Sequence, residues 1–137
     1  MALVYIGRKL RRGQRGQALV ELALVVPVLL LLVLGIFEFG RLLNAYMTVQ
    51  HAAREGARLG ILGATDVEIE TVVVSTAATT LDTTRLTVVI SPPVSSRTSG
   101  VIMTVSVTYT FEVIVPLFDR ILGSSVPITS NLSMRVE

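Results

Sequence analysis

One long apolar run dominates the pattern of hydrophobic and polar positions. From Leu22 to Phe37 no residue is charged, and apolar residues flank this run at 18–20 and at Phe39. A helix of about 20 apolar residues is about 30 Å long, which matches one crossing of a bilayer. The pattern therefore predicts a single membrane-spanning helix near the start of the chain.

The helical pattern continues beyond this run but becomes amphipathic. One helix is expected from about Ala18 to Leu59, with residues 17–40 in the membrane and residues 41–62 projecting from it. The outer half must project because a helix of this length is about twice as long as a bilayer is thick. The apolar and small residues that recur at helical spacing are Leu42, Ala45, Tyr46, Val49, Ala52, Ala53, Gly56, Ala57 and Gly60.

Four positions of this helix are candidates for close helix packing. Pro27 removes a backbone hydrogen bond and favours a kink, and Gly35 lies later in the same apolar run. Gly56 and Gly60 are small residues four positions apart, a spacing that lets another helix approach closely. Gly60 has an equally good alternative role as the cap at the C-terminal end of the helix.

A second, shorter helix is expected from Thr65 to about Leu81. Thr65 and Glu68 have the spacing of a capping box, and Asp66 is favourable in the first turn. The three valines at 72–74 and the many threonines favour a strand instead, but the capping pattern indicates a helix. Its apolar face is expected to contain Val67, Thr71, Val74, Ala78 and Leu81.

The rest of the chain has the alternating pattern of strands. Three segments alternate between apolar and polar positions, namely residues 85–90, 101–113 and 128–136. Residues 116–127 show little regular pattern and are expected to be a loop. Three antiparallel strands cannot bury one face alone. Residues 63–137 are therefore expected to form an α+β head in which a helix covers a small three-stranded antiparallel sheet.

Basic residues are concentrated at the start of the chain. Five of the twelve Lys and Arg residues lie within residues 1–16, which hold no acidic residue, whereas the rest of the chain has seven basic and ten acidic residues. Basic residues before a span keep that end in the cytoplasm. Residues 1–16 are thus interpreted as a cytoplasmic leader and the head as extracytoplasmic. This basic charge does not indicate nucleic-acid binding, which needs a basic patch on a folded surface.

No group of residues has the pattern of a catalytic or metal-binding site. The chain has no cysteine, and it has no phosphate loop, zinc motif or serine-hydrolase motif. The single histidine, His51, is expected to be solvated or to lie at an interface. Helix capping explains the acidic residues Asp66, Glu68 and Glu70. We expect no enzyme activity, no cofactor and no bound metal.

The charged residues of the long helix are of two kinds. Glu38 and Arg41, and likewise Glu55 and Arg58, lie three residues apart and are expected to form intrahelical ion pairs. Glu21 has no Lys or Arg within the four residues after it, and a carboxylate at the edge of hydrocarbon is costly unless it is paired.

Cleavage of the chain after Gly16 would provide a partner for this carboxylate. The new amino group of Gln17 could then neutralise Glu21 of a neighbouring copy as both become buried between helices. An ion pair with hydrogen bonds largely offsets the desolvation cost of the two charges. The alternative is that Glu21 is hydrated among lipid headgroups.

The run Gly16-Gln-Ala-Leu-Val-Glu21, followed by an apolar span, resembles the class III signal of type IV pilins and pseudopilins. With Gly35-Ile-Phe-Glu-Phe-Gly-Arg41 and residues 52–58 included, the chain resembles the TadE/TadG-like pseudopilins of tight-adherence (Flp) pili. Residues 108–111 and 132–137 are also similar to that family. The resemblance implies a pilin-like fold, cleavage by a prepilin peptidase between Gly16 and Gln17, and a role for Glu21 in assembly.

The resemblance further implies a structural function. The chain would assemble through its hydrophobic helix into a tight-adherence-type pilus or surface filament, or prime the assembly of one. The implied partners are copies of the chain or other pilins, a prepilin peptidase, an inner-membrane assembly platform and membrane lipid. The implied location is the bacterial inner membrane, crossed once. The alternative is a single-span anchor that carries an extracytoplasmic binding module.

Overall fold

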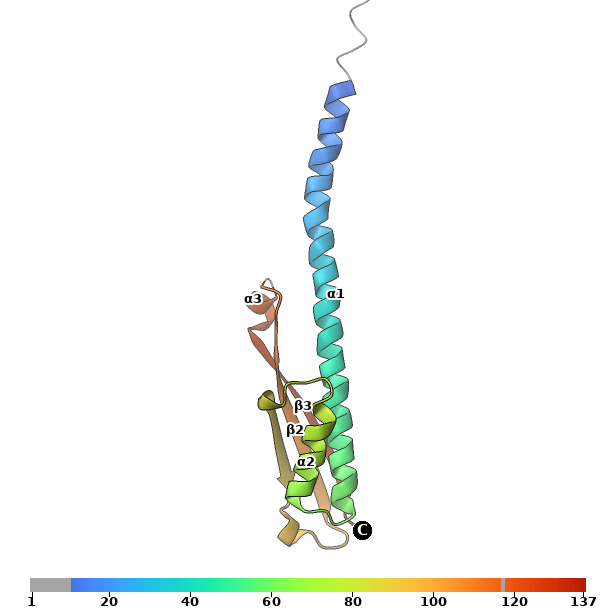
Figure 1. Cartoon of the computed structure of the whole chain (residues 1–137), viewed down its shortest axis with the longest axis vertical. Coiled ribbons are helices and arrows are strands. Elements are labelled where there is room, and N and C mark those ends of the chain that lie inside the picture. Colours follow the sequence, from blue (N-terminus) through green and yellow to red (C-terminus); the bar gives the residue numbers. More distant parts are fainter. Residues whose placement is uncertain (1–10, 117) are drawn as a thin grey trace, which may run out of the picture. The chain divides into compact units, whose positions relative to one another are not determined.

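The computed structural model describes residues 11–116 and 118–137, and Figure 1 shows the order of their helices and strands. The chain forms two compact units, the first ending at Phe37 and the second comprising Glu38–Glu137. A long helix, a short helix and a three-stranded antiparallel sheet are its main elements. The predicted α+β class is confirmed.

Helix α1, Arg11–Ile61, has 51 residues and includes Pro27. It begins before the predicted start near Ala18, and its first residues belong to the basic segment. Glycine disfavours a helix by only about 1 kcal/mol and causes no clash. Adding residues to an existing helix is also far easier than nucleating one, so the apolar helix extends into the basic segment.

The C-terminal end of α1 is a Schellman motif around Gly63. The Ala64 N–H donates to the Leu59 carbonyl at 3.3 Å, and the Gly63 N–H donates to the Gly60 carbonyl at 3.2 Å. Gly63 has a φ of 86°, a conformation that favours glycine. Gly60 therefore lies inside the helix, and the alternative prediction that it caps the helix is wrong.

Helix α2, Asp66–Ala77, begins with the predicted capping box. The Glu68 N–H donates to the Thr65 hydroxyl at 3.4 Å, and the Thr65 N–H donates to the Glu68 carboxylate at 2.8 Å. These two bonds satisfy the backbone N–H groups of Thr65 and Glu68, which have no acceptor within the helix. The helix ends at Ala77, earlier than the predicted end near Leu81.

The predicted apolar face of α2 is wrong. Its fully buried residues are Ile69, Val73 and Ala77, whereas Val67 is exposed. Three consecutive valines give the helix more than one possible apolar face. The face that is buried is the one whose side chains lie against Gly56 of α1.

The sheet has the order β1-β2-β3, and both neighbouring pairs are antiparallel. Strand β3 begins before the predicted residue 128, and a short helix, α3 (Asp119–Leu122), lies in the segment predicted to be an irregular loop. Pro127 pairs with Thr110 in the added part of β3. An edge strand tolerates the missing N–H of proline. The strands are β1 (Leu86–Ser91), β2 (Ile102–Glu112) and β3 (Ser125–Arg135), and two 3₁₀ turns, η1 (Thr83–Arg85) and η2 (Val94–Ser96), flank β1.

One face of the sheet forms the core with α2 and the C-terminal half of α1, which lie alongside it in Figure 1. The alternation predicted for the middle strand is confirmed, because its valines and aromatics are buried. Hydroxyl groups join β2 and β3 on the other face, where Thr104 and Ser133 are 2.8 Å apart and Thr108 and Thr129 are 3.1 Å apart. The buried residues of β2 are Met103, Val105, Val107, Tyr109 and Phe111.

Candidate functional site

The apolar segment of the first unit is uncovered among the residues that the structure describes. Its large apolar side chains from Leu19 to Phe37 are between 40% and 70% exposed. Among the described residues, α1 is the one helix long and apolar enough to cross a membrane, with a mean hydropathy of 2.9 in its most apolar window. Exposed apolar surface of this extent needs a cover from outside the chain, which can be lipid or other helices. Pro27 lies within this segment, and Gly35 is half-buried near its end.

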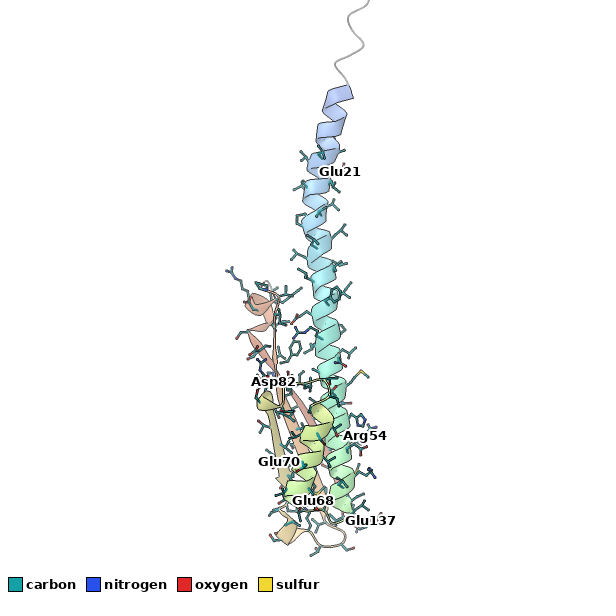
Figure 2. The ribbon with its side chains drawn as sticks, viewed as in Figure 1. Glu21, Arg54, Glu68, Glu70, Asp82 and Glu137 are labelled. Carbon is teal, nitrogen blue, oxygen red and sulfur yellow. The ribbon has the colours of Figure 1, made fainter. Side chains whose placement is uncertain are left out.

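Glu21 lies in this uncovered part of α1, as Figure 2 shows, and its side chain is exposed. Its neighbours Val20 and Leu22 are also exposed. Of the α1 carboxylates, Glu38 and Glu55 form ion pairs with described side chains, and Glu21 does not. The carboxylate thus stands among apolar side chains whose cover must come from other molecules.

Gly16 and Gln17, the predicted cleavage junction, lie inside α1, and Gln17 precedes Glu21 by about one helical turn. A Cβ added to Gly16 would meet no atom within 4 Å, so the described chain does not require glycine there for packing. A Cβ added to Gly40 would also meet no atom within 4 Å. Gly40 is thus a matched glycine in the same helix but outside the junction.

Glu38 is the first residue of the second unit and is buried, at 7% exposed. Its two carboxylate oxygens accept hydrogen bonds from Nη1 of Arg41 at 3.1 and 3.0 Å, which confirms the predicted intrahelical pair. Oε1 also accepts a hydrogen bond from the backbone N–H of Ile114 at 3.1 Å. The guanidinium carbon of Arg41 lies 5.0 Å from the centre of the Phe111 ring, within the range of a cation–π contact.

These contacts join the start of the second unit to the chain that follows β2. A buried carboxylate costs free energy unless hydrogen bonds satisfy it, and Glu38 has three such bonds. The sequence predicted the Arg41 partner from its spacing but missed the Ile114 partner. A backbone N–H distant in sequence leaves no pattern by which it could have been found.

Gly56 and Gly60 lie where α1 packs tightly against other elements of the second unit. A Cβ at Gly56 would be 2.5 Å from Cγ2 of Val73 and 3.5 Å from Cγ1 of Val105. A Cβ at Gly60 would overlap the end of the Met103 side chain. Within one chain, both glycines therefore allow α1 to approach α2 and β2. A role for them, or for Pro27 and Gly35, in packing between subunits stays a prediction.

The acidic residues at the start of α2 have structural partners. Asp66 forms an ion pair with Arg97, whose side chain is almost fully buried and also donates to the Ala64 carbonyl at 3.1 Å. Hydrogen bonds from the Thr65 backbone and hydroxyl lower the pKa of Glu68. Among the described residues, no three His, Asp or Glu side chains are grouped as a metal site requires. The sequence predicted the helix cap but missed Arg97.

His51 is exposed and lines an open hollow of about 750 Å³ between α1 and the end of α2. Most of the residues that line it are of polar types, including Asn44, Arg54, Thr76 and Thr80. Across this hollow the hydroxyl groups of Thr48 and Thr80 are 3.0 Å apart. Glu55 is paired with Arg58 at 3.1 Å, as predicted.

Comparison with known proteins finds a family that resembles most of the long helix. The family model described as TadE-like protein matches residues 16–58, whereas no match is found among curated proteins or among solved structures. The matched segment begins at the predicted junction, includes Glu21 and the whole apolar run, and ends within the last turn of α1. The resemblance of residues 108–111 and 132–137 to the same family lies outside the match and stays a prediction. Residues 16–58, which form most of the long helix, are therefore similar to the TadE-like family.

Proposed function

We propose that this chain is a structural pilin-like subunit that builds, or primes the assembly of, a tight-adherence-type pilus or surface filament. Its TadE-like segment indicates a pilus-related role, and its apolar helix fits anchoring in a membrane. The observation that carries the proposal is that the apolar side chains of the TadE-like segment are uncovered. A surface of this kind is stable either in lipid or against the helices of other subunits.

The proposed assembly step moves α1 from lipid into contact with the helices of other subunits. Cleavage between Gly16 and Gln17 frees an amino group, which pairs with Glu21 of the next copy. Because a lone carboxylate is heavily penalised in an apolar environment, the pairing sets the register of neighbouring helices. In the uncut chain the residue before Gln17 occupies its nitrogen, and α1 continues back to Arg11, so this pair cannot form.

The proposed location follows from the charge pattern. The basic leader lies in the cytoplasm, residues 17–40 cross the bacterial inner membrane, and the head lies outside the cytoplasm. The partners are a prepilin peptidase, an inner-membrane assembly platform and other pilins. No catalytic role is proposed for any residue of the chain.

The hydroxyl-rich face of the sheet favours a second candidate, a single-span anchor that carries a binding module. Ser and Thr side chains of β2 and β3 are paired across this face, which carries few charges. In this alternative the face binds a partner outside the cytoplasm while α1 stays monomeric in lipid. Single cysteines on the apolar segment distinguish the two, since copies of α1 crosslink to one another in a filament and do not in a monomeric anchor.

The first test is the mass and N-terminal sequence of the protein purified from its own cells. A start at Gln17 is expected, and Gly16→Ala should abolish this cleavage. Gly40→Ala is the matched control because neither glycine has a neighbour within 4 Å of an added Cβ, so both changes affect the helix alike. An uncut leader in the native protein would exclude the pairing of the Gln17 amine with Glu21.

A further inference from the structure

The connection between β2 and β3, described at residues 113–116 and 118–124, displays large apolar side chains. Ile114 is 66% exposed, Ile121 73% and Leu122 56%. The Val113 N–H donates to the Ser124 carbonyl at 3.2 Å and closes the connection, and the Leu122 N–H donates to the Phe118 carbonyl at 2.8 Å. Burial in the core therefore does not explain these apolar residues, and clustered exposure of this kind marks an interaction surface.

The connection is held beside the start of the second unit. Ile114 donates its N–H to Glu38, and Glu38 directly follows Phe37, the last residue of the apolar run. Arg41 lies over the ring of Phe111 in the last part of β2. If α1 crosses a bilayer through this run, Glu38 is the first residue after the span, and its bond to Ile114 holds the start of the connection beside that residue.

The opposite end of the second unit is the one where α1 ends, and it lies far from the connection between β2 and β3. Gly60 lies against Met103, at the start of β2, so α1 and β2 run in opposite directions. From Glu38 to Gly60 the helix rises by about 33 Å. Figure 1 shows α3 at the end of the sheet away from the connection between α1 and α2. The apolar turn thus belongs to the membrane-side end, and Leu62 belongs to the far end.

Basic side chains accompany the apolar ones at the membrane-side end. Arg120 is exposed within α3, and the side chain of Arg41 is 43% exposed. Arginine beside exposed apolar residues suits the boundary between headgroups and acyl chains, because its stem lies on apolar surface while the guanidinium reaches phosphate.

We propose that the described part of the connection between β2 and β3 is a second membrane contact, in which Ile114, Ile121 and Leu122 enter the boundary between lipid headgroups and acyl chains. Arg120 lies at the level of the phosphates. The contact rests on the proposed anchoring of α1 and orients the second unit on the bilayer. Its occupant is the phospholipid bilayer that holds α1, because the Glu38–Ile114 bond holds the turn beside the residue that directly follows the apolar run.

The experiment measures lipid proximity at single labelled cysteines. The chain has no cysteine of its own, so Ile121→Cys and Leu62→Cys each give one site for an environment-sensitive nitrobenzoxadiazole probe. Leu62 is the matched control, being apolar and 65% exposed at the far end of the second unit. The full chain is placed one copy per nanodisc of phosphatidylcholine and phosphatidylglycerol, with or without spin-labelled lipid. Leu30→Cys reports on the span, and Leu122→Cys repeats the test at a second site of the turn.

Spin-labelled lipid should quench the probes at Ile121 and Leu122 several-fold more than the probe at Leu62, and their emission should shift to the blue. Equal quenching at Ile121, Leu122 and Leu62, with strong quenching at Leu30, would overturn the membrane contact and leave the anchoring of α1 intact. Failure to quench at Leu30 would overturn the anchoring, and the contact with it. The two failures are therefore distinguishable.

Discussion

The two halves of α1 show opposite ways in which one helix uses its surface. Before Glu38 the helix carries large Leu, Val, Ile and Phe side chains that the chain leaves exposed. After Glu38 it carries small residues, and Ala45, Ala52, Gly56 and Gly60 are buried under α2 and the sheet. Small residues allow close approach of elements within one chain, whereas large exposed residues require cover from outside it.

This contrast separates two kinds of requirement in one helix. The second half satisfies its own packing, so changes there should alter the stability of the second unit. The first half has no such partner in the described chain, so changes there should alter insertion and assembly while the second unit stays folded. Substitutions matched between the two halves can test this division.

Loss of the Glu21 charge is expected to have the largest effect. Glu21→Gln keeps the shape of the side chain but removes the charge that, in the proposed assembly, pairs with the Gln17 amine, so filaments should be absent. Thermal unfolding of the second unit should not change. Electron microscopy of filaments from cells and circular dichroism of the purified protein measure the two effects. Glu55→Gln is the control in the second half, and normal filaments from Glu21→Gln would contradict the assembly role.

Adding a side chain at Gly56, where there is no room for one, should have the next largest effect, this time on stability. A Cβ there would be 2.5 Å from Val73 and 3.3 Å from Ile69, both fully buried. Gly56→Leu should therefore lower the free energy of unfolding by about 2–3 kcal/mol through overpacking. Urea unfolding in detergent checks the value. Gly40→Leu adds the same side chain where an added Cβ meets nothing, and it should be neutral or slightly stabilising.

Removal of the Glu38 carboxylate tests the boundary between the two halves. Glu38→Ala leaves the Ile114 N–H without its acceptor, which should cost about 1–3 kcal/mol. Glu38→Gln should recover part of this loss, since the amide oxygen can accept the same bond. Hydrogen exchange at the Ile114 amide measures the local effect. Glu55→Ala removes an exposed pair and should change stability by less than about 0.5 kcal/mol; an equal loss for both would contradict a special role of Glu38.

The sequence predicted the elements whose signals are local. The apolar run, the capping box of Thr65 and Glu68 and the alternation of β2 each lie within one segment, and each is confirmed. The prediction of the buried face of α2 was wrong, because its sequence allows more than one apolar face. Packing against Gly56 and the sheet decides which face is buried, and that information lies on other elements.

The candidate site was predicted less completely, for a related physical reason. Gly16, Gln17 and Glu21 came from a short signal, and the structure shows where they lie in α1 without testing what they do. The contacts that were missed, Glu38 with Ile114 and Asp66 with Arg97, join residues far apart in sequence. One uses a backbone donor and the other an arginine in a loop, and neither has a characteristic spacing.

The smallest expected effect concerns how stability depends on pH through Glu68, at the start of the helix α2 that covers the second half of α1. The hydrogen bonds from Thr65 lower the pKa of Glu68 in the folded chain below its ordinary 4.5. A carboxyl whose pKa is lower in the folded than in the unfolded state stabilises the fold above its unfolded pKa. This contribution is lost as the pH falls below about 4.5 and through the folded value. Glu68→Gln should therefore flatten the dependence of unfolding on pH in that range. Glu70→Gln, which removes an equal charge from an exposed glutamate outside the capping box (Figure 2), is the control. Equal flattening by both changes would show that net charge, and not the capping box, sets the acid sensitivity.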